Sequence, residues 1–540
     1  MTAATAGHLI AAQAPGAVPT VIFLLVVSFT LLLCFFFSVD SEGIEDLYSA
    51  GHSLSSWKNA LALTGDSISI LTLLSTTGMV ALAAYDGTTL ALSTAGGLGV
   101  LLVLARPLRN IGQFTLGDTL DARFGGRSIR IAAAVATITI SMPLAVVQLT
   151  AAGKATAGLL GLSGTGAAQV STVFIGAIMI CAAGLTGMRG NTMLAVVKTV
   201  MLFVCMGLLS VFVMARMGWN PGRLLADAAD SSGSPDNYLA PGGFLGTHLT
   251  GRFDLISMQL SIVLGAAVVP HNIMRVKAAE HGASARRSVV YAVAAVGAFC
   301  AMAVLLGLGA AALGGQASSR GFDVQSADSL LSLVNSLSSE GRGDLFVTMT
   351  VSAIFLTSLT VVAALALSAG AALVHDVYVQ GVRRGAVPTA VEVRAMRWVT
   401  PVVGASAVLL SVLAQRWSIQ FLAQFAVAAA ASAILPSLVY ALFWRRCTRA
   451  GVLCSIYAGL GSCVLLQFFG PAVSGTPGAL FPDADFAWFP FATTGLVSVP
   501  VGFAAGWVAS LLSSHRQDPA AAERYDQLAD RAVLEDVSAV

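Results

Sequence analysis

One carboxylate lies deep inside an apolar segment that is long enough to span a membrane. The segment runs from Leu61 to Gly78, and Asp66 lies within it, beside Gly65 and among several hydroxyl groups. A charged side chain at the centre of a bilayer costs about 2.5–3.5 kcal/mol on insertion scales. Asp66 could be a structural carboxylate that orders a kinked helix. The favoured interpretation is an intramembrane site where an interrupted helix frees backbone carbonyls for a cation.

Lys198 is the only lysine that lies well inside an apolar span. It lies about two turns from the expected cytoplasmic end, so its stem can carry the ammonium out to the interface, which is the favoured interpretation. The alternative is a partner for Asp66 or for the carboxylate of a substrate. Among three glutamines in apolar spans, Gln148, Gln259 and Gln424, Gln259 is the best candidate ligand because it lies at an expected helix break.

The composition indicates a polytopic protein of the lipid bilayer. Of 540 residues, 56% are hydrophobic and only 10% are charged, and the mean hydropathy is +0.82. Soluble domains contain about 25% charged residues. The basic residues are spread over short loops, which argues against a nucleic-acid partner. The seven cysteines are an odd number without metal-ligand spacing, so we expect no disulfide, no zinc site and no cofactor beyond a coupling ion.

The apolar segments predict a multi-pass protein of the plasma membrane. The first apolar run follows no basic segment and has no small-residue cleavage pattern, so it is interpreted as a retained helix rather than a signal peptide. The thirteen expected spans cover residues 20–38, 58–84, 88–105, 131–152, 167–187, 191–215, 254–275, 288–313, 345–374, 396–414, 419–444, 450–468 and 490–513.

The basic residues predict the orientation of these spans. An odd number of spans puts the two termini on opposite sides of the membrane. With the N-terminus outside, the inside loops and the tail hold 21 lysine and arginine residues, whereas the outside loops hold seven. Because inside loops carry the excess of positive charge, we expect the N-terminus outside and the C-terminus in the cytoplasm.

The order of the spans predicts an inverted repeat. When the first span is set aside, the next five match the following five in order and in opposite orientation. The opening span of each half carries polar interruptions, at 64–67 in one and at 257–261 and 264–265 in the other, and such paired breaks point to the central site of a transporter. The division is 1–57 (N-terminal segment with the first helix), 58–215 (first repeat), 216–253 (extracellular loop), 254–444 (second repeat), 445–513 (two C-terminal helices) and 514–540 (cytoplasmic tail).

Six sequence blocks between residues 46 and 380 carry a resemblance: Leu47–Ser55, Gly65–Ser69, Arg106–Asp118, Gly184–Gly190, Leu264–His271 with Arg275, and His375–Tyr378. The first two resemble the opening of the sodium/solute symporter family, and the others resemble its acetate and monocarboxylate permease branch. The resemblance implies an all-α fold of about thirteen transmembrane helices, with a LeuT-like core of two five-helix inverted repeats, one N-terminal helix and two C-terminal helices. It also implies alternating access and cation-coupled uptake of a small carboxylate.

The resemblance places a cation site at the break in the second span and on the ninth span. Transferred by position, the expected cation-binding residues are Thr64, Asp66, Ser67, Thr357 and Thr360. Val361 departs from the family's sodium pattern, because the family often has a hydroxyl at that position. The coupling ion therefore stays open between sodium and protons, with sodium narrowly favoured. Asp66 is the expected carrier if the ion is a proton.

The expected substrate is a small monocarboxylate such as acetate, propionate or pyruvate. The core spans are rich in Ala, Gly and Leu and lack the convergent polar cluster that a sugar needs. The candidate substrate-binding residues are Ser69, Gln259, Ser261 and Lys198. The alternatives are symport of an amino acid or a sugar, or a proton-pump subunit of a redox complex. An enzyme is not expected, because the chain contains neither an HExxH nor a GxSxG motif.

Overall fold

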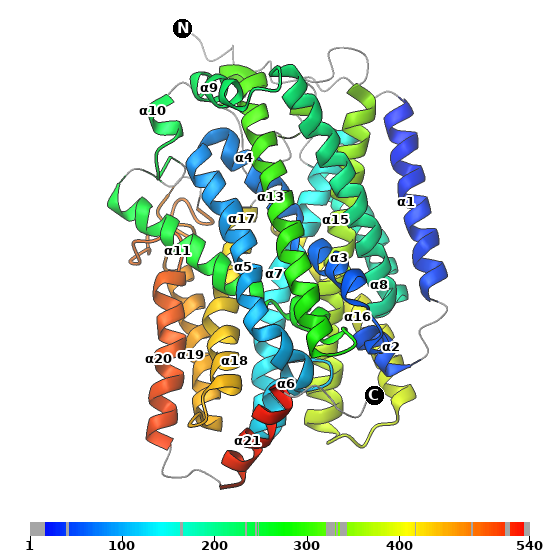
Figure 1. Cartoon of the computed structure of the whole chain (residues 1–540), viewed down its shortest axis with the longest axis vertical. Helices are drawn as coiled ribbons and strands as arrows, with labels where there is room; N and C mark the ends of the chain where they lie inside the picture. The colour runs from blue at the N-terminus through cyan, green and yellow to red at the C-terminus, as the bar shows by residue number, and fades with distance from the viewer. Residues whose placement is uncertain are drawn as a thin grey trace.

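The computed structural model describes residues 17–38, 43–162, 166–232, 235–243, 246, 248–319, 330, 333–334, 343–415, 417–476, 479–513 and 519–533. These residues form helices joined by short connections, and no β-strand occurs among them beyond two isolated bridges (Figure 1). Long apolar helices are expected of a chain that must satisfy its backbone hydrogen bonds within lipid.

Eleven helices in the described chain are long and apolar enough to cross a membrane, or twelve if one bent pair counts as a span. α1 (Ala17–Ser38) contains a shorter apolar stretch, Thr20–Phe36. The expected total of thirteen is therefore not confirmed. The other long helices of the bundle are α5 (Ala84–Asn110), α7 (Arg127–Leu159), α8 (Ala167–Arg216), α13 (Gly282–Ser319), α15 (Gly343–Ala371), α16 (Thr389–Leu413), α19 (Arg449–Phe468) and α20 (Gly495–Ser513). One further span, Ile419–Phe443, includes α17 (Ile419–Ala429) and α18 (Leu435–Phe443).

The second expected span is broken, as its polar interruption predicts. α3 (Ser56–Ser67) and α4 (Ile70–Leu82) meet at an angle of 55°. Ser69 caps the new helix, because its hydroxyl accepts a hydrogen bond from the backbone N–H of Thr72 at 3.2 Å. Gly65 allows α3 to approach α8, since a Cβ at this position would lie 2.6 Å from the Thr199 hydroxyl. The break is thus held close against α8.

The seventh expected span is broken as well, at the second of its two expected interruptions. α11 (Leu249–Gly265) leads through a 3₁₀ turn, η2 (Ala266–Val268), into α12 (Pro270–Lys277). The break follows Leu264–Gly265, as expected, and Pro270 begins the next helix without needing a backbone N–H donor. The segment 257–261, which the sequence also suggested as an interruption, is continuous helix, because its serine bonds back to the helix itself.

α8 and α15 carry the residues that face the first break. α8 combines two expected spans, and Gly187 adopts a φ of +50° at the kink between them. α15 continues as a π-helix, η3 (Ala372–Val382), and its most apolar window is wholly buried. No charged residue occurs between Phe346 and Val374, so this helix can occupy the centre of the bundle.

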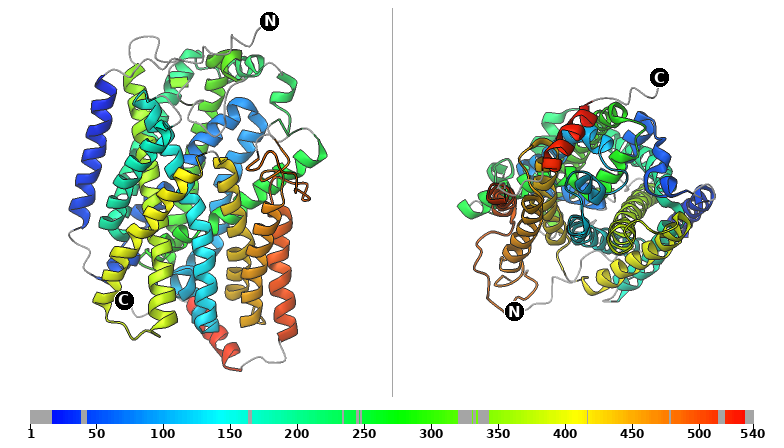
Figure 2. Two further views of the ribbon diagram at one scale, coloured as in Figure 1. Left: turned by 180° about the vertical axis from the view of Figure 1, so that it is seen from behind. Right: turned by 90° about the horizontal axis from the view of Figure 1, so that it is seen from below.

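The bundle has two distinct ends (Figure 1). α9 (Pro221–Ser231) and α10 (Pro235–Tyr238) lie at one end, called here the α9 end. α6 (Leu116–Phe124) and α21 (Pro519–Val533) lie at the other, the α21 end. α21 lies within the segment 514–540 that the sequence analysis gives as the tail. α1 and the pair α19–α20 lie on opposite sides of the bundle (Figure 2). The remaining helical elements are the π-helix η4 (Ala430–Ile434), α2 (Ile44–Ser49) and the 3₁₀ turn η1 (Ala50–His52).

Candidate functional site

A cavity of about 120 Å³ lies against both helix breaks. Its polar lining comes from the break in the first repeat, from α4 and α7, from α12 and from α17: Asp66, Ser67, Ser69, Thr72, Ser75, Thr76, Gln148, His271, Asn272, Gln420 and Gln424. The remaining wall is largely apolar and includes Leu90, Leu98, Ile262 and Val427. A mostly apolar cavity with a few convergent polar groups is typical of a small-molecule site.

The cavity lies toward the α9 end. On α5, its lining residues Leu90, Thr94 and Leu98 belong to the first part of the helix. That part lies close to the segment after α10, because Asp86 of α5 accepts a hydrogen bond from the Gly242 N–H at 2.9 Å. The Tyr238 hydroxyl of α10 likewise donates to the carbonyl of Val80 on α4 at 2.8 Å. In the expected orientation this side is extracellular.

Asp66 forms a buried ion pair with Arg275 of α12. Its Oδ2 accepts hydrogen bonds from Nε at 2.8 Å and from Nη2 at 2.6 Å, and Nη1 of the same arginine donates to the Thr192 hydroxyl at 2.5 Å. Asp66 is 2% exposed and Arg275 is fully buried. Among the described residues, Oδ1 of Asp66 has no hydrogen-bond partner. Arg275 therefore bonds only one oxygen of this carboxylate, and the other oxygen has no hydrogen-bond partner among the described residues.

Lys198 lies at the same break, and its expected position at the interface is wrong. The side chain is 1% exposed, and its ammonium donates to the backbone carbonyls of Gly65 and Ile68, the second at 2.8 Å. The physical reason is the break itself, which leaves carbonyls without helical donors inside the protein. The ammonium therefore donates to these nearby carbonyls instead of extending to the distant membrane interface.

The structure distributes the expected cation-binding residues unevenly. Asp66 and Ser67 line the cavity, whereas Thr64 bonds within its own helix through both its hydroxyl and its carbonyl. Thr360 likewise donates back to Leu356, but the buried hydroxyl of Thr357 has no partner among the described residues. The ion-binding roles of all five residues stay predictions.

The expected substrate residues divide in the same way. Ser69 lines the cavity, while Gln259, Ser261 and Lys198 do not. The Ser261 hydroxyl donates to Ser257 at 2.8 Å and faces α20, where a Cβ on Gly495 would collide with it. This face of α11 therefore packs against a C-terminal helix rather than against the cavity.

Sequence reasoning missed Arg275 as the partner of Asp66. Arg275 follows the block Leu264–His271 at the expected inside end of a span, where an arginine is normally part of a loop. It also missed the ligand potential of Thr72, Ser75 and Asn272, which line the cavity. The one available signal was the density of hydroxyl residues between 64 and 77.

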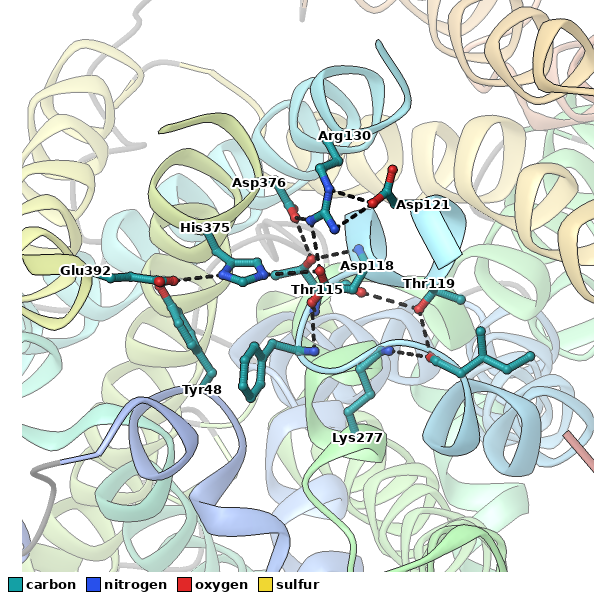
Figure 3. Close-up of polar contacts among 12 residues, drawn as sticks. Tyr48, Thr115, Asp118, Thr119, Asp121, Arg130, Lys277, His375, Asp376 and Glu392 are labelled. Atoms are coloured by element: carbon teal, nitrogen blue, oxygen red, sulfur yellow. Dashed lines mark hydrogen bonds and ion pairs between the residues drawn. The ribbon is translucent and has the colours of Figure 1, made fainter. Parts of the chain in front are cut away.

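A second buried polar group, called here the α21-end cluster, joins several helices (Figure 3). It consists of Tyr48, Thr115, Asp118, Asp121, Arg130, His375, Asp376 and Glu392. Arg130 of α7 pairs with Asp118 at 2.8 Å, with Asp121 at 2.7 Å and with Asp376 at 3.2 Å. His375 lies between two carboxylates, with Nδ1 2.8 Å from Glu392 and Nε2 3.1 Å from Asp118.

Asp118 is the best-connected carboxylate of the α21-end cluster. It takes part in a capping box at the start of α6 with Thr115, and it accepts backbone hydrogen bonds from Phe114 and Thr115. Burial alone raises its pKa, but the hydrogen bond from His375 and the positive charges of Arg130 and Lys277 hold the pKa of Asp118 well below its usual range. Asp118, His375 and Asp376 lie close enough to hold a metal ion, but Arg130 already supplies their countercharge.

A model of the sodium:solute symporter family matches residues 47–459. The chain belongs to the sodium:solute symporter family. A monocarboxylic acid transporter of Corynebacterium glutamicum is 35% identical over 490 residues, covering 88% of each chain. The uncharacterized symporter YwcA of Bacillus subtilis is 33% identical over 498 residues, covering 92% of this chain and 94% of that one. The protein is therefore a multi-pass, cation-coupled membrane symporter and not an enzyme, as expected.

Two solved structures of other members of the wider fold confirm the expected fold class of this symporter. An outward-open Na⁺-coupled sialic acid symporter superposes with a TM-score of 0.73 at 14% identity, covering 92% of this chain and 98% of that chain. Mhp1, a nucleobase-cation-symport-1 family transporter in a closed conformation, gives a TM-score of 0.55 at 13% identity, covering 90% and 98%. The all-α, LeuT-like architecture is confirmed, whereas such low identities carry no information on substrate.

Proposed function

We propose that this symporter takes up a small monocarboxylate, such as acetate, propionate or pyruvate, together with a coupling cation. The observation that carries the proposal is the cavity at the two breaks, whose largely apolar wall carries polar side chains such as Ser69 and Asn272. A short acid with one charged group and a small apolar body matches that combination. The 35% identical relative named as a monocarboxylic acid transporter supports the same substrate class.

The carboxylate of the substrate binds at the first turn of α4. Ser69 and Thr72 present hydroxyls there, and the N-terminal end of the helix carries partial positive charge. Gln148 of α7 supports this turn, because its side-chain oxygen accepts a hydrogen bond from the Ile70 N–H at 3.1 Å. Leu98 and Ile262 form part of the wall that receives the methyl group.

The coupling cation acts at the break between α3 and α4, where Asp66 and Ser67 line the cavity. Both Asp66 Oδ1 and the Ser67 hydroxyl are buried without a partner among the residues described, so they are available to a ligand. The ion is sodium or a proton. Alternating access carries it with the substrate to the α21 end, which the excess of basic residues assigns to the cytoplasm.

An amino acid is the second candidate substrate. The unpartnered Oδ1 of Asp66 offers an acceptor for an ammonium group in the wall of the same cavity. An α-amino acid would place its carboxylate at α4 and its ammonium at Asp66. A sugar has less support, because it needs hydrogen-bond partners around its whole ring, whereas most of the exposed cavity wall is apolar.

A competition assay tests the substrate class. The purified full-length protein is reconstituted in vesicles, and uptake of labelled pyruvate is measured with excess propionate, acetate, proline or galactose. We expect both carboxylates to compete and the other two solutes to have no effect. Inhibition by proline or galactose, but not by the carboxylates, rejects the proposal. Ser69→Ala should raise the pyruvate concentration that half-saturates uptake about 5–30-fold, as expected for one lost charge-assisted hydrogen bond.

Cysteine labelling tests the orientation. Gln527 on α21 is exposed, and Gln527→Cys in a cysteine-free background gives a single reactive thiol at the α21 end. We expect an impermeant maleimide to react with it only in inside-out vesicles. Labelling of intact cells would reverse the assigned orientation.

A further inference from the structure

The carbonyls that the break in the first repeat leaves free are already bound to a cation. Lys198 of α8 donates to Gly65 O and to Ile68 O, one on each side of Ser67, where α3 ends. Its ammonium therefore joins the end of α3 to the residues that lead into α4. A metal ion that bound the free carbonyls of this break would therefore compete with Lys198 for Gly65 O and Ile68 O.

The buried charges around Lys198 leave no room for a second cation. Within the part of the chain that the structure describes, Asp66 of α3 is the carboxylate that acts on it, and Arg275 of α12 already pairs with that carboxylate. His271 of α12 is the remaining titratable group coupled to Lys198. α15 packs against α8 with hydroxyl-bearing and apolar residues, and it has no titratable side chain between Phe346 and Val374.

A sodium ion at the same carbonyls would lie within a few ångströms of the ammonium. Two unit positive charges about 4 Å apart repel enough, at the effective dielectric of a protein, to weaken binding about 1,000-fold. Val361 of α15, which lines the cavity, removes one oxygen ligand as well. Both the charge balance and the ligand set therefore disfavour sodium at the break.

We propose that Lys198 is a tethered cation that takes the place of sodium at the α3–α4 break, so that this symporter is coupled to protons. This inference rests on the proposed cation-coupled symport and names its ion. On the outer side a proton binds the neutral amine of Lys198, and the ammonium formed ties Gly65 to Ile68. On the inner side the ammonium returns the proton to water and releases the two carbonyls. One proton moving with one monocarboxylate transfers no net charge.

A sodium-binding measurement tests the inference without any substrate. The thermal stability of the purified wild-type protein is compared in sodium chloride and in choline chloride at equal ionic strength, because a bound ion stabilises the folded state. We expect equal melting temperatures and no saturable binding of ²²Na⁺. Saturable stabilisation by millimolar sodium would overturn the inference, whatever the substrate is.

Transport in vesicles gives the second test, with labelled pyruvate as the probe. Accumulation by the wild type should follow an inward proton gradient and change less than twofold when potassium replaces sodium. Lys198→Met and Lys198→Arg remove the titrating amine, so each should lose proton-driven accumulation by about tenfold or more. Both should retain exchange of internal for external pyruvate, which requires no net proton movement.

Lys58→Met is the matched control, since this lysine lies exposed on α3. It should accumulate pyruvate like the wild type. Proton-driven accumulation by either Lys198 variant contradicts the inference. If Lys198→Met does not fold, Lys198→Arg and the sodium-binding measurement still decide. If the wild type neither accumulates nor exchanges pyruvate, the substrate proposal fails while the sodium measurement still tests the role of Lys198.

Discussion

Two buried ionic groups differ in how completely their charges are satisfied. At the α3–α4 break, one carboxylate, Asp66, lies with two cations, Arg275 and Lys198, and one of its oxygens has no partner. In the α21-end cluster, four carboxylates are held together by Arg130 and His375 and by hydroxyl and backbone donors. The first group borders the cavity, and the second lies where α2, α6, α7, η3 and α16 meet.

This difference teaches which group exchanges a ligand and which one holds the protein closed. An incompletely satisfied carboxylate in a cavity wall can bind and release a charge. A cross-linked cluster that joins five elements must break before those elements can separate. We therefore expect the break to take part in coupling and the α21-end cluster to hold the α21 end closed.

α12 connects the two groups mechanically. Arg275 reaches Asp66, and Lys277, two residues later, donates to the Ile111 carbonyl at 2.8 Å, close to the start of α6. Lys277 is also within electrostatic reach of Asp118 and Asp376. A shift of α12 would therefore disturb both groups at once, as alternating access requires.

Removing the charge of Asp66 should have the largest effect. Asp66→Asn leaves Arg275 buried with no countercharge, which costs about 3–5 kcal/mol of unfolding free energy and should abolish coupled uptake. Adding Arg275→Met to the variant should recover most of the stability but none of the uptake. The measurements are thermal unfolding in detergent and pyruvate uptake in vesicles.

Asp227→Asn is the control for this change, because it removes an exposed carboxylate that pairs with Arg223 on α9. Such a surface pair contributes about 0–1 kcal/mol. Full activity of Asp66→Asn would mean that Asp66 has a structural role only. The break would then not differ from the α21-end cluster in function.

Breaking the α21-end cluster should have the next largest effect. Arg130→Met removes the shared partner of three carboxylates and should destabilise the protein by about 3 kcal/mol. The α21 end should then open more easily. A cysteine replacing the buried Ser368, which lines a small hollow beside Asp376, should react several-fold faster with a maleimide. Arg445→Met, which removes an exposed pair with Asp526, should leave that rate unchanged.

The acid sensitivity of the α21-end cluster gives a smaller effect. Because the folded pKa of Asp118 lies below its unfolded value, its ionisation stabilises the fold above about pH 4, and this contribution is lost as the pH falls further. Asp118→Asn should lower stability by about 2 kcal/mol at neutral pH and flatten the fall below pH 4. Melting temperatures measured from pH 7 to pH 3 check this. An unchanged acid limb would assign the sensitivity to another carboxylate.

The sequence predicted the break better than its partners. Asp66 was identifiable because a carboxylate in a long apolar run has few explanations. Arg275 could not be identified in the same way, because an arginine near the end of a span normally belongs to a loop. Only the tertiary approach of α12 to α3 brings it to Asp66. The sequence places Lys198 at the interface because an unbroken neighbouring helix would offer it no free carbonyls. The α3–α4 break supplies those of Gly65 and Ile68. Ser261 does not line the cavity because its part of α11 is intact helix and its side chain packs against α20, and Gln259 does not line the cavity either.

The α21-end cluster was invisible as a unit in the sequence. Its members come from segments as distant as Tyr48 and Glu392. Three of the sequence blocks, those starting at Leu47, ending at Asp118 and starting at His375, contain cluster residues, but nothing in their spacing shows that they meet. Their association depends on the packing of α6 against α7 and η3.

The smallest expected effect comes from Val361, and it tests whether the break could still accept sodium. Restoring a hydroxyl with Val361→Thr supplies an oxygen ligand on α15 but leaves the Lys198 ammonium on the carbonyls of Gly65 and Ile68. The single variant should therefore change sodium dependence by less than about twofold. The double variant Lys198→Met/Val361→Thr removes the competing charge and should be the first form to show saturable sodium stabilisation. Melting temperatures in sodium and in choline measure both variants. Sodium-dependent uptake by Val361→Thr alone would mean that ligand count, rather than the charge of Lys198, sets the ion.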